Sequence, residues 1–521
     1  MPKTLRDLIV AFSLANLCFI AAWRVLVNPL HYSYYHWKYY PGFTEYVALV
    51  IDVSVLAALF WGAATLARRS GRPALQRVAR GAFLLALVVP LNDLRMQFLG
   101  NVFFNSRKSL LIMLAALFVV AAAAAWRWRA YLVRAAVALV LILSPFALIS
   151  LTQGAWFTYK HRTNAALAVD RPAGPLPRLA NLPGGRVVWI VFDEMDQGRA
   201  FVKRPDGLDL PEFDRLRREA VFAENALPPS SDTLFSMPSL ISGQQIEWAL
   251  AVSPNELMVI AKGSSKQVAW STQPNVFSEA REVGAETALA GWYHPYCRVI
   301  GASLSNCFWQ PVVDEINPLR GRPTVGKSMA HWATMTLFRI PGAFRLLEHW
   351  YELGRRHDHI EDQSKIMDSA RAIAKERAFR LTLLHFPVPH PPFIYDRAGR
   401  ALSDGAAHTY DDNLALADRT LGELRREMEA AGLWDNTAVI VSSDHWLRPP
   451  YGNQIDKRVP FIVKLPGQRE GSTYPTPFNT VVTRALILAL LREEVTDPPG
   501  LVRWLDQNRS DAQPTIGITV R

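Results

Sequence analysis

Charged side chains are scarce in long stretches of the first 155 residues, although the whole chain of 521 residues carries a formal net charge of +11. Crossing a bilayer takes about 20 predominantly apolar residues, and five stretches are long enough. This composition excludes a soluble N-terminal part, whereas the rest of the chain is typical of a soluble domain. The five predicted transmembrane spans lie near residues 7–27, 43–67, 81–100, 109–126 and 132–153.

A signal-peptide cleavage site is also missing. The first apolar stretch is long and uninterrupted, and no small-residue site follows it, so we interpret it as a retained span. The sequence continues with Trp23-Arg24 and then with the aromatic loop 31–40, which is rich in Tyr. Aromatic side chains gather at the membrane–water boundary, and we expect this loop to anchor the protein there.

Positive charge is sparse in two of the loops between these spans, which carry Lys38 in one and Arg107 and Lys108 in the other. Basic loops stay in the cytoplasm, so the richer segments fix the orientation. The N-terminus is then cytoplasmic, and an odd number of spans leaves everything after about residue 154 outside. The basic residues on the cytoplasmic side are Lys3, Arg6, Arg68, Arg69, Arg72, Arg77, Arg80, Arg127, Arg129 and Arg134.

The third predicted span contains two ionisable residues, Asp93 and Arg95. Ionisable side chains within a membrane are costly and often functional. Two interpretations stay open: a functional group, or a local Asp93–Arg95 ion pair near the end of the span.

Cysteine is rare, with three residues in the whole chain. Cys18 lies within the first span, whereas Cys297 and Cys307 lie close together in the predicted outer domain. An oxidising compartment favours a disulfide between the latter two. A metal site at these cysteines is not expected, since His294 is the only other ligand-type residue nearby.

The outer part of the chain begins with a Pro- and Gly-containing linker, 154–185, after the membrane domain 1–153. Three apolar runs then read as buried parallel strands, at 186–192, 378–384 and 437–441. Helical patterns separate them, at 327–350, 363–377 and 409–431. This alternation predicts an α/β sandwich over residues 186–500, followed by a C-terminal tail at 501–521.

Ligand-type side chains follow each of these strands. Because ligands bind outside the carboxyl edge of open α/β sheets, we expect these side chains to converge. Carboxylates with imidazoles suit a divalent cation, Zn²⁺ in the first place, with Mn²⁺ or Ca²⁺ as alternatives. The residues are Asp193, His385, His390, Asp444 and His445.

A hydroxyl at a predicted helix start completes this set. Residues 230–243 give a cap-type residue and then an apolar run, which is typical of a helix N-terminus. Thr233 stands at that start, where the positive end of the helix dipole favours an alkoxide. It is therefore a candidate nucleophile, and the alternative is a residue that only caps the helix. Ser231 and Ser236 are the competing hydroxyls of the same stretch.

These motifs resemble the alkaline phosphatase superfamily in its sulfatase-like branch, and specifically the membrane-anchored bacterial phosphoethanolamine and phosphoglycerol transferases. The resemblance covers roughly residues 186–467. VVWIVFDE places Asp193 as a metal-binding acid, and TLFSMPSLISG places Thr233 ten residues before Gly243 as the nucleophile. HFPVPHPPF supplies two histidines five residues apart, SSDH supplies the metal pair Asp444-His445, and KRVPFIVKLPG follows as a strand.

Four features depart from the family pattern. Trp446 stands where the family usually has Gly, and Met237 stands where sulfatases have an arginine. No Cys occupies the nucleophile position, so formylglycine formation and true sulfatase activity are not supported. The transferases carry a further His downstream of His445, where Lys457 could substitute in charge and contact substrate.

The resemblance implies a metal-dependent enzyme of the bacterial inner membrane with a periplasmic catalytic domain. It would move a phosphoethanolamine- or phosphoglycerol-type group from a phospholipid to an envelope glycan or lipid through a covalent intermediate on Thr233. Asp193, Asp444, His445 and Thr233 would hold the metal, and His385 and His390 would bind phosphate or transfer protons. No nucleic-acid partner is expected. Two alternatives stay open: a phosphate or sulfate ester hydrolase with the same site, and a catalytically silent lipid-binding regulator of envelope assembly.

Overall fold

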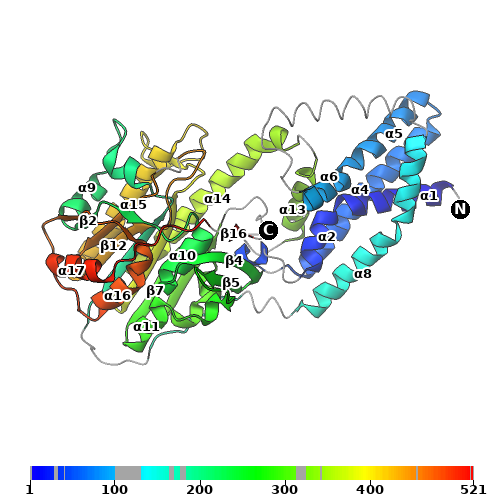
Figure 1. Cartoon of the computed structure of the whole chain (residues 1–521). Helices are drawn as coiled ribbons and strands as arrows, with labels where there is room; N and C mark the ends of the chain where they lie inside the picture. The colour runs from blue at the N-terminus through cyan, green and yellow to red at the C-terminus, as the bar shows by residue number, and fades with distance from the viewer. Residues whose placement is uncertain are drawn as a thin grey trace. The chain divides into compact units, whose positions relative to one another are not determined.

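The chain divides into two compact units in its computed structural model (Figure 1). The helical unit comprises Met1–His31, Tyr39–Ala166 and Pro318–His349, and the sheet unit comprises Tyr32–Lys38, Leu167–Asn317 and Trp350–Arg521. The structure describes residues 3–28, 33–39, 41–99, 131–162, 169–176, 184–312, 324–340, 343–452, 456–516 and 518–519.

Apolar helices make up the helical unit. Three helical stretches of the described residues are long and apolar enough to cross a membrane: Phe43–Arg69, Pro73–Gln97 and Tyr131–Lys160. The pair formed by α1 and α2 is bent by 64° and makes a fourth if it counts as one span. The predicted span 109–126 lies outside the described residues, so the structure supports three to four of the five predicted spans. The helices are α1 (Lys3–Cys18), α2 (Ile20–Val27), α4 (Phe43–Arg69), α5 (Pro73–Ala86), α6 (Val88–Leu99) and α8 (Pro145–Lys160).

A later part of the chain returns to this unit as α13 (Val325–Leu337) and packs on α4. The Trp332 indole donates a hydrogen bond to the carbonyl of Glu45, at 3.1 Å. The prediction of one helical stretch over 327–350 was wrong in its boundaries. The helix α13 ends at Leu337, and a separate helix α14 spans Ala343–Ala374.

Asp93 also has partners far away in sequence. Its carboxylate lies 3.0 Å from Arg24 and 3.6 Å from Arg339, while Arg95 donates to Asn92. The ion pairs of Asp93 therefore extend beyond the local pair that the sequence suggested.

An eight-stranded sheet forms the centre of the sheet unit, in the order β14-β2-β13-β12-β1-β9-β7-β8. The three predicted strands are confirmed and lie side by side in parallel, with β1 between β9 and β12. β7 and β8 extend the parallel part, whereas β13 and β12 are antiparallel. The strands are β1 (Val187–Asp193), β2 (Val221–Ala223), β7 (Glu286–Tyr293), β8 (Asn306–Pro311), β9 (Phe379–Pro389), β12 (Ala438–Ser443), β13 (Phe461–Lys464) and β14 (Ser472–Tyr474).

Helices cover both faces of this sheet, which explains why β1 is apolar throughout. All seven residues of β1 are buried. Alternate side chains enter opposite cores: Trp189 packs among the residues of one cluster and Ile190 among those of the other. One face carries α10 (Thr233–Ser242), α11 (Val276–Glu282), α16 (Thr483–Leu491) and α17 (Pro498–Asn508), and the other carries α9 (Pro211–Arg218), α14 and α15 (Tyr410–Ala430) (Figure 1). The predicted α/β architecture is confirmed.

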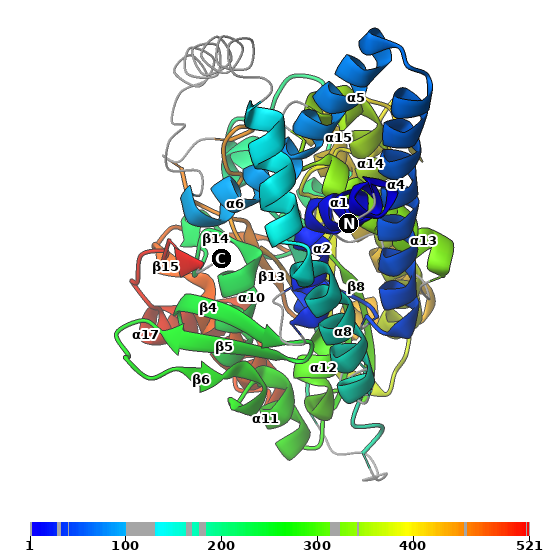
Figure 2. The same cartoon turned by 90° about the vertical axis from the view of Figure 1, so that its right-hand side faces the viewer.

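A smaller sheet of β4, β5, β6 and β16 lies in the same unit, with β4, β5 and β6 side by side in Figure 2. The short helix α3 (Ser33–His36) packs against β4, although it comes from the aromatic loop between the first two predicted spans. Tyr34, Tyr35 and Trp37 are buried there in protein. The predicted lipid anchor at this loop is therefore wrong for these three side chains.

Short elements complete the described structure. The strands are β3 (Ala226–Leu227), β4 (Ile246–Ser253), β5 (Glu256–Ala261), β6 (Val268–Ala269), β10 (Tyr395–Asp396), β11 (Ala401–Leu402), β15 (Phe478–Asn479) and β16 (Ile518–Thr519). The helical turns are α12 (Tyr296–Val299), a π-helix at Gly198–Val202, and 3₁₀ turns at Trp270–Thr272, Gly301–Ser303, Trp434–Asn436 and Thr480–Val482.

Candidate active site

Thr233 is the first residue of α10, as the sequence predicts. Asp232 precedes it in extended conformation, and Gly243 ends the helix with a φ of 68°. Such a left-handed end favours glycine, since a side chain there is strained. The Thr233 side chain thus lies at the N-terminal end of the helix dipole and is almost fully buried.

Two other hydroxyls of this motif, those of Ser230 and Ser236, donate to backbone carbonyls. Ser236 donates to the carbonyl of Ser230 at 3.2 Å, and Ser230 donates to the carbonyl of Thr515 at 3.1 Å. These bonds hold the loop before α10 against the C-terminal segment. The Thr233 hydroxyl, in contrast, contacts side chains of the acidic cluster.

Three of the predicted metal ligands converge on Thr233. Asp193 ends β1 and Asp444 follows the neighbouring strand β12, so the parallel register brings their carboxylates together. Thr233 Oγ1 lies 3.3 Å from Asp193 Oδ2 and 3.4 Å from His445 Nε2. One ligand atom each from Asp193, Asp444 and His445 lies within 4.8 Å of the others, and all three residues are buried.

The hydrogen bonds of this cluster fit a cation. His445 Nδ1 donates to the carbonyl of Trp446 at 3.0 Å, so the lone pair of Nε2 faces the carboxylates. Asp193 Oδ1 and Asp444 Oδ2 are buried without a hydrogen-bond donor. Buried acceptors normally have a partner, and three converging lone pairs favour a divalent metal. The donor set therefore fits the divalent cation predicted from the sequence.

The electrostatics of the two carboxyls agree with this interpretation. Burial raises the pKa of Asp193 to about 7, against smaller opposing effects of His390 and Arg448. Burial, and then the charge of Asp193, raise the pKa of Asp444 to about 7. Two buried carboxylates repel each other unless a proton or a cation lies between them. A bound cation would replace the proton near neutral pH.

The two predicted histidines of β9 and its following loop lie beside this cluster, but their rings are not among its three ligands. His385 is fully buried, with Nδ1 3.0 Å from the Tyr296 hydroxyl and Nε2 without a hydrogen-bond partner. Burial lowers its pKa to about 3, so the ring is neutral at pH 7. His390 donates from its backbone N–H to the Asp193 carbonyl at 3.1 Å, and its Nε2 lies 3.7 Å from Glu194.

Sequence reasoning missed two charged residues at this edge. Glu194 follows β1 with a φ of 63° and is buried. Arg448 donates to Glu194 Oε1 from both its backbone N–H and Nε, each at 3.0 Å, and its Nη2 lies 3.5 Å from His390 Nε2. The acidic Asp193-Glu194 pair after a strand was the available signal for Glu194.

Lys457 was predicted to contact substrate. Its ammonium lies 5.4 Å from the centroid of the Trp446 ring.

Two further aromatic residues of the site come from the segment after β7. His294 is fully buried, and burial holds the pKa of its imidazole well below the usual value. Its Nε2 lies 3.0 Å from the carbonyl oxygen of Thr233. Tyr296 bonds His385, as described above. The sequence analysis considered His294 only as a ligand-type neighbour of the cysteines, and not as part of this site.

The predicted disulfide is present. Cys297 of α12 and Cys307 of β8 are joined, with 5.6 Å between their Cα atoms. The bond therefore ties the turn that carries Tyr296 to the edge strand of the main sheet. Cys18 is a free, buried cysteine.

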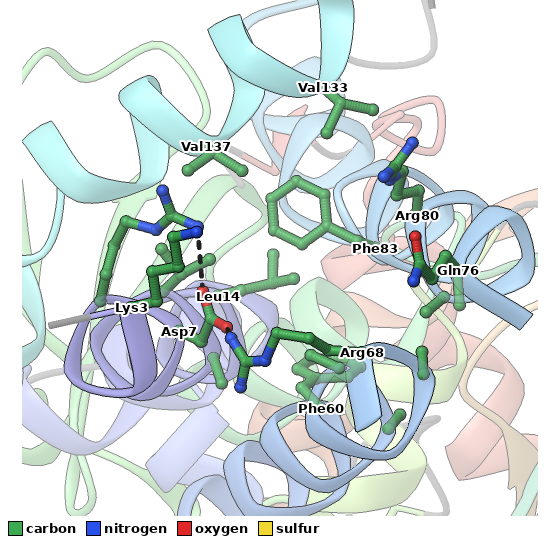
Figure 3. Close-up of a pocket in the computed structure, with 18 residues that line it drawn as sticks. Lys3, Asp7, Leu14, Phe60, Arg68, Gln76, Arg80, Phe83, Val133 and Val137 are labelled. Atoms are coloured by element: carbon green, nitrogen blue, oxygen red, sulfur yellow. Dashed lines mark hydrogen bonds and ion pairs between the residues drawn. The ribbon is translucent and has the colours of Figure 1, made fainter. Parts of the chain in front are cut away.

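A separate pocket of about 560 Å³ lies within the helical unit (Figure 3). Apolar side chains such as Phe60, Phe83 and Val137 line it, together with basic side chains from α1, α4 and α5. Asp7 pairs there with Arg6 and Arg68. These basic residues belong to the segments predicted to be cytoplasmic.

Comparison with known proteins supports the resemblance found in the sequence. Residues 195–451 match the family described as type I phosphodiesterase / nucleotide pyrophosphatase. The matched region contains Thr233, His385, His390 and the Asp444-His445 pair, and begins two residues after Asp193.

A curated relative is the ulvan-active sulfatase of Formosa agariphila, which is 32% identical over 100 residues. These residues make up 17% of this chain and 20% of that protein, so the match spans about a fifth of the relative's length.

Solved structures resemble the chain at low identity. The lipoteichoic acid synthase LtaP from Listeria monocytogenes is 13% identical, with a TM-score of 0.37, over 59% of this chain and 73% of that one. The PsFucS1 sulfatase from Pseudoalteromonas sp. is 17% identical, with a TM-score of 0.41, over 59% and 68%. The phosphonate monoester hydrolase SpPMH from Silicibacter pomeroyi is 15% identical, with a TM-score of 0.37, over 59% and 73%.

Proposed function

Because this chain is an enzyme of the alkaline phosphatase superfamily, we propose that it transfers a phospholipid headgroup phosphate to an envelope acceptor. The group is of phosphoethanolamine or phosphoglycerol type, and the acceptor is an envelope glycan or lipid. Thr233 carries the group as a covalent phosphothreonine ester between the two half-reactions.

One observation carries this proposal: a buried threonine hydroxyl stands at a helix N-terminus within 3.4 Å of two candidate metal ligands. A free threonine hydroxyl is a weak nucleophile. The helix dipole and a nearby cation both lower its pKa and favour the alkoxide. Asp232 is the N-cap residue of α10, and the Thr233 hydroxyl donates to Asp193, which speaks against a role in capping alone.

The transfer divides into two balanced steps. In the first, the Thr233 oxygen attacks phosphorus, the bond between phosphorus and the diacylglycerol oxygen breaks, and diacylglycerol leaves after taking a proton. In the second, an acceptor hydroxyl attacks the same phosphorus, the bond from phosphorus to Thr233 breaks, and the threonine regains a proton. No electrons are exchanged with an external partner.

The chain supplies the groups for these steps. Asp193, Asp444 and His445 would hold a divalent cation beside Thr233, and the cation would offset negative charge on the phosphoryl oxygens. His385 is neutral, with a free Nε2 that can accept a proton or contact a phosphate oxygen. His390 and Arg448 lie at the same edge and can bind the phosphate anion.

A lipid donor agrees with the rest of the chain. Three to four apolar helices of the described residues could cross a membrane. An enzyme held in this way meets phospholipid headgroups at the surface of the bilayer, which supports a lipid as the first substrate.

A second candidate is hydrolysis of a phosphate ester by the same site. It is favoured by the description of the matching family as phosphodiesterases. Water would then replace the acceptor hydroxyl in the second step. Release of the headgroup phosphate without an added acceptor distinguishes the hydrolase from the transferase.

The proposal is tested by trapping the intermediate. The full-length protein in detergent micelles is mixed with phosphatidylethanolamine or with phosphatidylglycerol, and its peptides are analysed by mass spectrometry. We expect the added phospho-group on Thr233 and release of diacylglycerol. Thr233→Ala should lose turnover by several powers of ten, as loss of a covalent nucleophile does.

Ser236→Ala is the matched control, since its hydroxyl bonds a carbonyl outside the cluster and should leave the labelling of Thr233 in place. A phospho-group found on Ser231 or Ser236, or wild-type turnover in Thr233→Ala, contradicts the assignment.

A further inference from the structure

A chain of hydrogen bonds reaches Thr233 from the aromatic segment that precedes α4. The Tyr35 hydroxyl lies 2.8 Å from His294 Nδ1, and His294 Nε2 lies 3.0 Å from the carbonyl oxygen of Thr233. Tyr35 and His294 are both fully buried. Their rings meet edge to face, with 5.8 Å between centroids.

The partners of His294 determine which nitrogen carries the proton. A carbonyl oxygen can only accept, so Nε2–H donates to Thr233. Nδ1 then carries the lone pair and accepts a hydrogen bond from the Tyr35 hydroxyl. Without that hydroxyl, the ring can place its proton on Nδ1 and turn a lone pair toward the carbonyl, which is repulsive.

We propose that Tyr35 and His294 are positioning residues that hold Thr233 in its attacking orientation. The inference rests on the proposed role of Thr233 as nucleophile. Neither residue touches the substrate in this proposal; both act through the backbone of Thr233.

The reason lies in the geometry of the nucleophile. The carbonyl held by His294 and the hydroxyl that faces Asp193 belong to the same residue. A shift of the Thr233 backbone would carry its Cα along and move Oγ1 relative to Asp193 and His445. A displacement of about 1 Å of a reacting atom can cost about 100-fold in rate.

Other contacts hold the segment in place. The Trp37 carbonyl accepts a hydrogen bond from the buried Arg298 guanidinium. The Lys38 ammonium donates to the Trp309 carbonyl at 2.5 Å and lies 4.2 Å from the centroid of the Trp309 ring. Burial lowers the pKa of Lys38 to about 8, as expected for an ammonium removed from water. Tyr35 is thus presented by a docked segment and not by a loop in solvent.

The test compares turnover in full-length variants, with bis(p-nitrophenyl) phosphate as a soluble phosphodiester and phosphatidylethanolamine as a lipid. Tyr35→Phe removes only the hydroxyl, and we expect kcat to fall about 10-fold with little change in KM. His294→Ala should lower kcat about 100-fold. His294→Gln should recover most of the loss, because its amide N–H can still donate to Thr233.

Tyr34→Phe is the matched control, since it removes a hydroxyl from a buried tyrosine of the same helix and should keep wild-type kcat. Metal content should be unchanged in Tyr35→Phe and His294→Gln, and both should stay folded. If His294→Ala does not fold, these two variants decide.

The outcomes separate this inference from the function on which it rests. Wild-type turnover in Thr233→Ala would remove the proposed function. An inactive Thr233→Ala together with wild-type kcat in Tyr35→Phe, or with equal kcat in His294→Ala and His294→Gln, would overturn the positioning role alone. A rise in KM at constant kcat would also overturn it, since substrate binding and not nucleophile orientation would then have changed.

Discussion

At the scale of single residues, the candidate active site is defined by polar atoms that lack a donor. Asp193 Oδ1 and Asp444 Oδ2 are buried without one, and His445 turns a lone pair toward them. A protein can accept this arrangement if a cation completes it, because the free energy of binding then offsets the cost of burying charge.

The first prediction concerns metal binding by this cluster. Asp444→Ala removes a charged ligand, and the affinity for Zn²⁺ or Mn²⁺ should fall by at least about 100-fold, since even outer-shell partners contribute 10–100-fold. Asp193→Ala should act in the same way. Metal content of the purified full-length protein, measured by atomic spectrometry, checks the result.

The control for this experiment is Asp404→Ala, which changes an exposed aspartate of the sheet unit. It should keep the metal content of the wild type. Full occupancy in both Asp193→Ala and Asp444→Ala would show that the ion binds elsewhere.

The residues predicted from the sequence share one property, which is a place directly after a strand or at a helix start. Asp193, Asp444 and Thr233 were identifiable for that reason. Arg448 and His294 were not, because they enter the site through loops whose conformation depends on tertiary packing. Tyr35 was misinterpreted, since a run of aromatic residues next to an apolar span is typical both of a lipid boundary and of a buried protein contact.

At the scale of elements, the disulfide connects a helical turn to a strand. Cys297 belongs to α12 and Cys307 to β8. Loss of the bond should destabilise the folded state by about 2–3 kcal/mol on the chain-entropy model for a loop this short. The thermal midpoint of a Cys297→Ser/Cys307→Ser variant should therefore fall.

Thiol counting gives an independent measurement of the same bond. Alkylation of the unreduced, denatured protein should modify Cys18 alone, and three cysteines should react after reduction. Three reactive thiols before reduction would contradict the disulfide.

The contact between α9 and α15 gives a pH prediction. The Asp418 carboxylate accepts the backbone N–H of Phe213 in the first turn of α9, at 2.8 Å, and burial raises its pKa to about 7. The folded state therefore holds this proton more tightly than the unfolded state. The contribution of Asp418 to the free energy of unfolding has its full value below about pH 4. It declines by about 1.4 kcal/mol per pH unit as the pH rises to about 7.

Asp418→Asn should remove this decline. Thermal midpoints at pH 5 and pH 7.5 should differ less in the variant than in the wild type, while Asp404→Asn, at an exposed position, should behave as the wild type. Parallel pH profiles for the wild type and Asp418→Asn would refute the assignment.

The elements themselves were predictable where the pattern was strong. The strands β1, β9 and β12 are apolar runs that feed two cores, and α15 shows a clear polar face, so their positions were evident in the sequence. The boundary between α13 and α14 was not evident, because both sides of it have helical composition. Which unit a helix joins depends on its partners, as the contact of Trp332 with Glu45 shows for α13.

At the scale of the whole molecule, the orientation in the membrane can be tested. The arginine-rich loop 68–80 and the segment 127–134 predict a cytoplasmic side, so a reporter enzyme that requires export, fused after residue 160, should be active. The same reporter fused after residue 70 should be inactive. Activity in the second fusion and not in the first would reverse the orientation and exclude an envelope substrate.

The order in which segments of the chain contribute to the two units has a consequence for proteolysis of the protein in the cell. Tyr35 is 259 residues away in sequence from its partner His294, and residues 39–166, between them, belong to the helical unit. A protease that cuts within 39–166 would leave the metal ligands, the nucleophile and the disulfide on one fragment and Tyr35 on the other. If the hydroxyl of Tyr35 orients Thr233, the fragment that carries the nucleophile would lose most of its activity once it separates from the fragment that carries Tyr35.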